Sequence, residues 1–124
     1  FLKTKRKIAI LGDMLELGRY AVDEHKKVGE KAAKVVDVLA TVGVRSRYTA
    51  DSALNAGMEE AEVFQFDDSA EAGRFMREVV KEGDVVLIKG SQGVRMERCT
   101  EELMAHPEDK ERLLVRQEAE WKER

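Results

Sequence analysis

Lys7-Ile8-Ala9-Ile10-Leu11, followed by Gly12-Asp13, is the stretch that decides the fold class of this chain. After the lysine the run is apolar without alternation, and it stops at a turn-forming pair. A strand that is apolar on both faces is typical of a parallel sheet covered by helices on both sides. The stretch therefore predicts a buried parallel strand at 7–11, with a loop at its carboxyl end.

The same strand pattern recurs three times, with helical periodicity in between. Strands are predicted at 38–42, 62–66 and 84–88. Helices are predicted over 23–36, with Val28, Ala32, Val35 and Val36 on the buried face; over 51–57, capped by Asp51; over 69–80, capped by Asp67-Asp68-Ser69; and over 96–104. Four strand–helix units predict the α/β class: a single-domain, Rossmann-like, open and mostly parallel sheet with helices on both faces.

Length and composition restrict the class of protein further. A chain of 124 residues with 43% hydrophobic residues fits one domain with a real core. The net charge of -3 argues against a nucleic-acid partner, and no apolar run reaches the length of about 18 residues that spans a membrane. Cys99 is the only cysteine, which fits a reducing, cytoplasmic location and a packed thiol. Because the chain opens on Phe1, we expect a processed chain or a piece of a longer protein.

The segment after the last predicted helix has two interpretations. Pro107-Glu108-Asp109 has the pattern of a helix start. Leu113-Leu114-Val115 could instead form a short edge strand. Residues 105–124 are therefore expected to be a helical or edge-strand extension.

Two strand ends carry the residues with binding chemistry. One is the loop from Gly12 to Gly18, with Asp13 and Glu16; the other begins at Lys89-Gly90-Ser91. A lysine, flexible glycines and free backbone amides before a helix suit a carboxylate or phosphate ligand. A tight turn with a surface lysine explains the second loop equally well, and paired carboxylates such as those of the first usually bond within their own loop.

Other site types are excluded or disfavoured by the residues present. The chain has neither the phosphate-binding pattern G-x-x-x-x-G-K-[ST] nor a dinucleotide fingerprint after its first strand. His25 and His106 are far apart and lack clustered cysteines, so no metal site is predicted. Ser91 has no paired base, and a capping or packing role is favoured for His25, so no catalytic residue is assigned.

The run from Ile8 to Gly18, with His25 and Val28-Gly29 behind it, resembles the C-terminal domain of the Mur ligase family. The later run Gly83–Ser91, with Met96-Glu97, resembles the last strand and loop of the same domain. The likeness covers about residues 7–104. It is strongest to the members that add D-alanyl-D-alanine to UDP-N-acetylmuramoyl-tripeptide in peptidoglycan synthesis.

The resemblance implies one domain of a three-domain, ATP- and Mg-dependent amide ligase. In that family the precursor carboxylate is activated as an acyl phosphate, which the amine of D-alanyl-D-alanine then attacks. The C-terminal domain closes over the central ATPase domain, which would be its partner, and presents the dipeptide. Its contribution is orientation of the substrate rather than proton transfer.

The resemblance also implies a set of substrate-binding residues. Lys89, Gly90, Ser91 and Gln92 would hold the carboxylate end of the dipeptide, and Asp13, Met14 and Glu16 would line the pocket or the boundary between the closed domains. The family commonly has arginine where Gln92 stands, and Arg95 could take over that role.

The family's P-loop and Asn-Pro motif are missing from this chain. We therefore expect a domain without its first strand and helix, inactive and without bound ATP when isolated. The alternative interpretation is a non-catalytic, flavodoxin-like binding or regulatory module.

Overall fold

The computed structural model describes residues 5–90, 95–104 and 114–117, and these form a five-stranded parallel sheet between helices. The strands are β1 (Lys7–Gly12), β2 (Val38–Val42), β3 (Val63–Phe66), β4 (Val85–Lys89) and β5 (Leu114–Gln117). Their order is β3-β2-β1-β4-β5, and every neighbouring pair is parallel. This is the strand order of a doubly wound α/β fold, as predicted.

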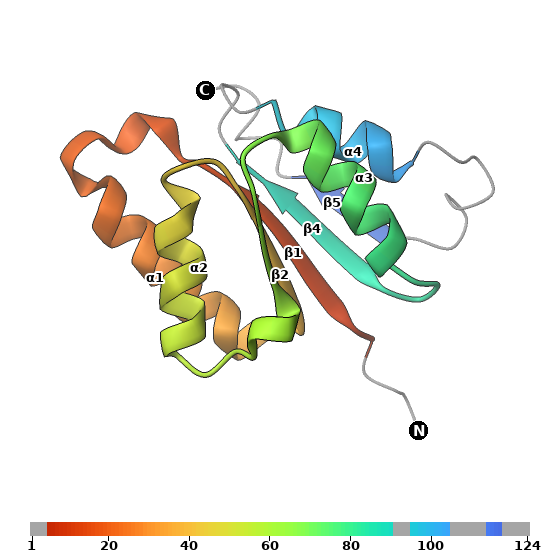
Figure 1. Ribbon diagram of the computed structural model, residues 1–124, viewed down its shortest axis with the longest axis horizontal. Coiled ribbons are helices and arrows are strands. Elements are labelled where there is room, and N and C mark those ends of the chain that lie inside the picture. The colour runs from red at the N-terminus through yellow and green to blue at the C-terminus, as the bar shows by residue number, and fades with distance from the viewer. Residues whose placement is uncertain (1–4, 91–94, 105–113, 118–124) are drawn as a thin grey trace.

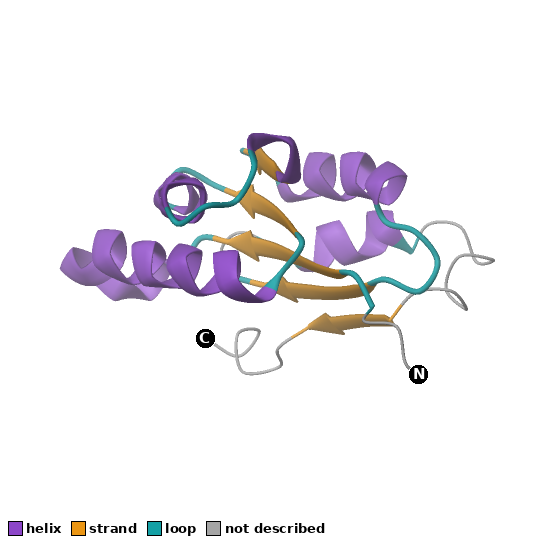
Figure 2. Cartoon of the chain, turned by 90° about the horizontal axis from the view of Figure 1, so that it is seen from below, coloured by secondary structure: helices purple, strands orange, loops and turns teal. Residues whose placement is uncertain are grey.

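Helices cover both faces of the sheet, as Figures 1 and 2 show. The α-helices are α1 (Ala21–Val35), α2 (Ser46–Asn55), α3 (Ser69–Val79) and α4 (Glu97–Leu103), and two 3-10 helices lie at Leu15–Tyr20 (η1) and Glu60–Glu62 (η2). Side chains of α1 and α2 share one core cluster with Ala9 and Leu11 of β1. Side chains of α3 and α4 share the other with Ile8 and Ile10. Strand β1 is thus buried on both faces, as the unbroken apolar run predicted.

Helix α2 differs most from the prediction. It begins at Ser46, five residues before Asp51, so Asp51 lies inside the helix and is not its cap. The residue that caps α2 comes from a distant loop, where no local pattern could reveal it. On α1 the predicted face is confirmed for Val28, Ala32 and Val36, which pack in one core cluster, but Val35 is 51% exposed. His25 and Gly29 are buried as well.

The cap of helix α3 is confirmed. Asp68 is its N-cap, and the Asp68 Oδ2 atom accepts a hydrogen bond of 2.9 Å from Glu71 N. Ala72 and Met76 are buried against the sheet. Phe75 is more exposed than a core position, but its ring packs against Phe64 and Phe66 of β3.

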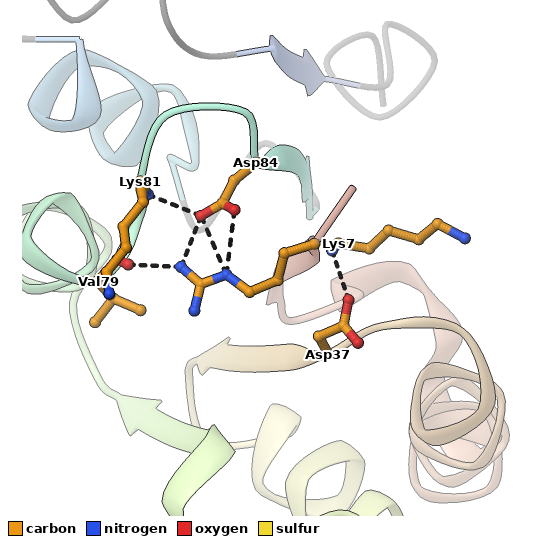
Figure 3. Close-up of polar contacts among 6 residues, drawn as sticks. Lys7, Asp37, Val79, Lys81 and Asp84 are labelled. Carbon is orange, nitrogen blue, oxygen red and sulfur yellow. Dashed lines mark hydrogen bonds and ion pairs between the residues drawn. The ribbon is translucent and has the colours of Figure 1, made fainter. Parts of the chain in front are cut away.

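A charged clamp joins the amino ends of β1 and β4 (Figure 3). The Arg6 Nη2 atom donates to Asp84 Oδ2 at 2.7 Å and to the Val79 carbonyl at 2.8 Å, and Lys81 N donates to Asp84 Oδ2 at 2.7 Å. Burial of the Asp84 carboxyl works to raise its pKa, but the hydrogen bonds from Arg6 and Lys81 outweigh it, so the pKa lies below its ordinary value. Arg6 is therefore a structural residue.

The described part of the tail is strand β5, which pairs in parallel with β4. The predicted helix start at Pro107-Glu108-Asp109 lies outside the described residues. Within the described ranges, no helix combines the length and the hydrophobicity that crossing a membrane requires.

Candidate ligand-binding site

The two strand ends with binding chemistry lie side by side. In the register of the central strand pair, Leu11 of β1 is opposite Lys89 of β4. Gly12 and Gly90 therefore lie next to each other at the carboxyl ends of these two strands. The chain passes from β1 to β2 on one side, whereas β4 lies on the other side. Ligands of open α/β sheets bind at such a switch point, beyond the carboxyl ends of the strands.

A small cavity of about 60 Å³ lies between these strand ends and the helices α1 and α2. A cavity of this size has room for a few non-hydrogen atoms. Most of the residues that line it are apolar or glycine, and one lysine, one histidine and one threonine are among them. The residues that line it are Leu11, Gly12, Met14, His25, Val28, Thr49, Lys89 and Gly90.

His25 connects α1 to the loop after β1. Its ring is 1% exposed, which confirms the expected packing role. The ring Nδ1 atom lies 2.6 Å from the Ala21 carbonyl oxygen, and Met14 N donates to the ring Nε2 atom at 3.1 Å. Because a carbonyl can only accept and an amide N–H can only donate, the two hydrogen bonds fit the tautomer that carries its proton on Nδ1.

Asp13 is buried next to the cavity, but its carboxylate faces α2. The Asp13 Oδ1 atom accepts from Ser46 N at 2.7 Å, and Oδ2 accepts from Arg45 N at 3.2 Å. The Arg45 Nη1 atom lies 3.8 Å from the same oxygen. Gly43 makes this arrangement possible, since a Cβ atom there would lie 2.5 Å from Asp13 Cγ. Both oxygens therefore serve the turn between β2 and α2.

Arg95 is not among the described residues that line the cavity. Its Nε atom donates to Glu97 Oε2 at 2.9 Å, and its carbonyl accepts from Ser69 Oγ at 2.9 Å. The pKa of Glu97 is lowered, first by a hydrogen bond from its own backbone N–H and further by Arg95. Arg95 has a positive φ of 53°, a conformation that costs a non-glycine residue about 1 kcal/mol or more.

The structure thus brings Met14, Lys89 and Gly90 together and directs the carboxylate of Asp13 elsewhere. Ser91, Gln92 and the side chain of Glu16 lie outside what the structure describes. The sequence did not identify Val28 and Thr49 as cavity residues. Thr49 was missed because the predicted start of α2 lay beyond it, which left Thr49 in a loop.

Comparison with known proteins shows which family this chain is similar to. Residues 1–92 match the family described as "Mur ligase, glutamate ligase domain". The UDP-N-acetylmuramoyl-tripeptide–D-alanyl-D-alanine ligase of Bacillus subtilis is 29% identical over 103 residues, which is 82% of this chain and 22% of that protein. The ligase of the same name from Mycobacterium leprae is 37% identical over 93 residues, which is 73% of this chain and 18% of that protein.

The fold is also similar to that of solved ligases. The crystal structure of MurF ligase from Thermotoga maritima in complex with ADP matches with a TM-score of 0.67 and 25% identity, over 86% of this chain and 23% of that one. The chain thus spans about a fifth of the length of the relatives it matches. With the family match over most of its length and the fold in common, the chain belongs to the Mur ligase family.

Proposed function

We propose that this chain is the C-terminal domain of an ATP-dependent amide ligase that adds D-alanyl-D-alanine to UDP-N-acetylmuramoyl-tripeptide in peptidoglycan synthesis. The observation that carries the proposal is that Gly12 and Met14 meet Lys89 and Gly90 around one cavity. It occurs at the switch point of the sheet, in a chain similar to ligases of that name.

The site would act by holding the dipeptide in place. The Lys89 ammonium group is suited to the carboxylate end, and the backbone of Gly90 allows close approach. Ser91, Gln92, Glu16 and Arg95 stay candidates for further contacts. Asp13 would act indirectly, by fixing the start of α2 beside the cavity. A fixed dipeptide presents its amine to the activated carboxylate, which lowers the entropic part of the barrier.

We assign ATP and Mg²⁺ to the central ATPase domain, which would be the partner of this chain. Among the described residues, no group of three or more histidine, cysteine, aspartate or glutamate side chains is placed to hold a metal ion. The chain also lacks a P-loop. The isolated chain is therefore expected to show no ATPase activity, and the complete enzyme would work in the cytoplasm, where ATP is available.

The test uses the complete ligase that carries this domain and measures ADP release as D-alanyl-D-alanine is varied. We expect Lys89→Ala to raise the KM for the dipeptide about 10- to 100-fold, since a hydrogen bond to a charged group contributes about 1.5–3 kcal/mol. Ser91→Ala is compared alongside. Lys27→Ala is the control, because Lys27 is exposed on α1 and its Nζ atom forms an ion pair of 3.1 Å with Glu24 on the same helix. An unchanged KM in both the Lys89 and Ser91 variants would refute the site.

A further inference from the structure

The loop after β1 is held by bonds to three different elements. Asp13 N donates to the Val42 carbonyl at the end of β2. The Asp13 carboxylate accepts from the amides at the start of α2. The next amide, Met14 N, donates to the His25 ring on α1. The shape of this loop at the cavity is therefore set by its neighbours, and the contact on the cavity side is the one made by His25.

The His25 ring is itself held in a single orientation. Its Nδ1–H group donates to the carbonyl of Ala21, one turn earlier on the same helix. Its backbone carbonyl accepts from Thr49 Oγ1 at 2.9 Å, which ties this turn of α1 to α2. With the ring buried and both nitrogens occupied, the acceptor that faces Met14 cannot rotate away without breaking a second hydrogen bond.

No apolar side chain could replace this ring without losing both of its hydrogen bonds. A phenylalanine of similar shape would leave the Met14 N–H and the Ala21 carbonyl without these partners beside the cavity. A partly buried donor without a partner costs free energy, and a loop can avoid that cost by turning its N–H toward water. The loop would then lose the shape it has at the cavity wall.

We propose that His25 is a positioning residue of this site: through Nε2 it holds the Met14 backbone, and so the loop after β1, in the conformation that receives the amine substrate. The inference rests on the proposed function and deepens it. His25 itself transfers no proton in this role, because its two ring nitrogens are used as a fixed donor and acceptor.

Two variants separate positioning from simple packing. In His25→Gln the longer side chain places a carbonyl oxygen where Nε2 lies, so it can still accept from Met14 N. In His25→Asn the shorter side chain reaches only the position of Nδ1, so it can bond Ala21 but not Met14. Both are polar and helix-compatible, and they differ in which of the two hydrogen bonds survives.

The variants are measured in the complete ligase. We expect His25→Asn to raise the KM for D-alanyl-D-alanine about 3- to 10-fold with kcat within about twofold, as the loss of one neutral hydrogen bond implies. We expect His25→Gln to stay within about twofold of the parent in both parameters. Equal losses in the two variants, or a loss in kcat alone, would overturn the proposal. If His25→Asn does not fold, a folded His25→Gln with a KM raised tenfold or more overturns it equally.

A spectroscopic measurement on the 124-residue chain separates this proposal from the proposed function. Scalar coupling across the hydrogen bond between the Met14 ¹⁵N and the His25 Nε2 ¹⁵N is expected in the parent and not in His25→Asn. An absent coupling in the parent refutes the positioning role. If the coupling is present but the KM is unchanged in both the Lys89 and Ser91 variants, the proposed site is refuted. The hydrogen bond between Met14 and His25 is then still supported.

Discussion

Gly29→Ala tests how closely the two helices beside the site are packed. Helix propensity alone predicts that alanine stabilises α1 by about 1 kcal/mol relative to glycine. The structure predicts the opposite sign. A Cβ atom on Gly29 would lie 2.2 Å from the Thr49 carbonyl oxygen and 2.9 Å from Ser52 Cβ. Carbon and carbonyl oxygen atoms pack at about 3.3 Å, so α1 and α2 would have to separate by about 1 Å.

That separation would stretch the hydrogen bonds that join the helices. Thr49 Oγ1 donates to the His25 carbonyl at 2.9 Å, and Ser52 Oγ donates to the Lys26 carbonyl at 2.7 Å. Each contributes about 0.5–1.5 kcal/mol, and overpacking a close contact costs about 1–3 kcal/mol. After subtracting the propensity gain, we expect Gly29→Ala to lower the free energy of unfolding by about 2 kcal/mol.

The assay is urea unfolding of the chain, followed by circular dichroism. The midpoint should fall while the slope of free energy against urea stays constant, because the same surface is exposed on unfolding. Glu30→Ala is the control, since Glu30 is exposed on the same helix, and its midpoint should barely change. A midpoint that rises in Gly29→Ala, as propensity predicts, would refute the close contact between α1 and α2.

Three further predictions concern other parts of the fold. Gly43→Ala should destabilise the chain by about 2 kcal/mol, because Gly43 has a φ of 110° and its Cβ would meet the Asp13 carboxylate; thermal unfolding measures this, and an unchanged Tm would contradict the contact. Asp84→Asn should destabilise the chain at pH 7. A carboxylate with a lowered folded pKa stabilises the fold above its unfolded pKa and loses that contribution on protonation, so the difference in stability from the parent should shrink as the pH falls below the ordinary Asp pKa of 3.8. Unfolding at pH 7 and pH 2 tests this, and a difference that persists in acid would count against the ion pair with Arg6. Burial raises the pKa of Cys99 to about 12, with Glu102 adding to it, so a disulfide reagent at pH 8 should label the thiol only after denaturant is added; rapid labelling of the folded chain would show that the thiol is accessible.

The strands were predictable because each run has the length and composition of one strand. All four predicted strands occur within a residue of their predicted limits. The start of α2 was not predictable, since its amides are capped by Asp13, which is more than thirty residues away in the sequence. Local patterns can identify only caps that are local, and so they favoured Asp51.

The location of the candidate site could be predicted from the sequence, but the directions of its side chains could not. Glycines and polar residues after two strands identified the edge of the sheet where the cavity lies. The direction of the Asp13 carboxylate was not predictable, because an acidic residue after a strand suits a ligand and a helix cap equally well. Because Gly43 has no Cβ atom, the Asp13 carboxylate has room beside it and can cap α2. That proximity depends on the three-dimensional packing.

The clamp at the amino ends of β1 and β4 has a consequence for how the chain reaches its fold. Arg6 and Asp84 are 78 residues apart, and the strands that follow them pair at the centre of the sheet. During synthesis the backbone N–H and C=O groups along one edge of β1 are therefore expected to stay unpaired until β4 has left the ribosome. Such late, long-range pairing is slow and exposes a strand that can bind other chains. The arrangement that unites the two loops of the site also makes their assembly one of the last steps of folding.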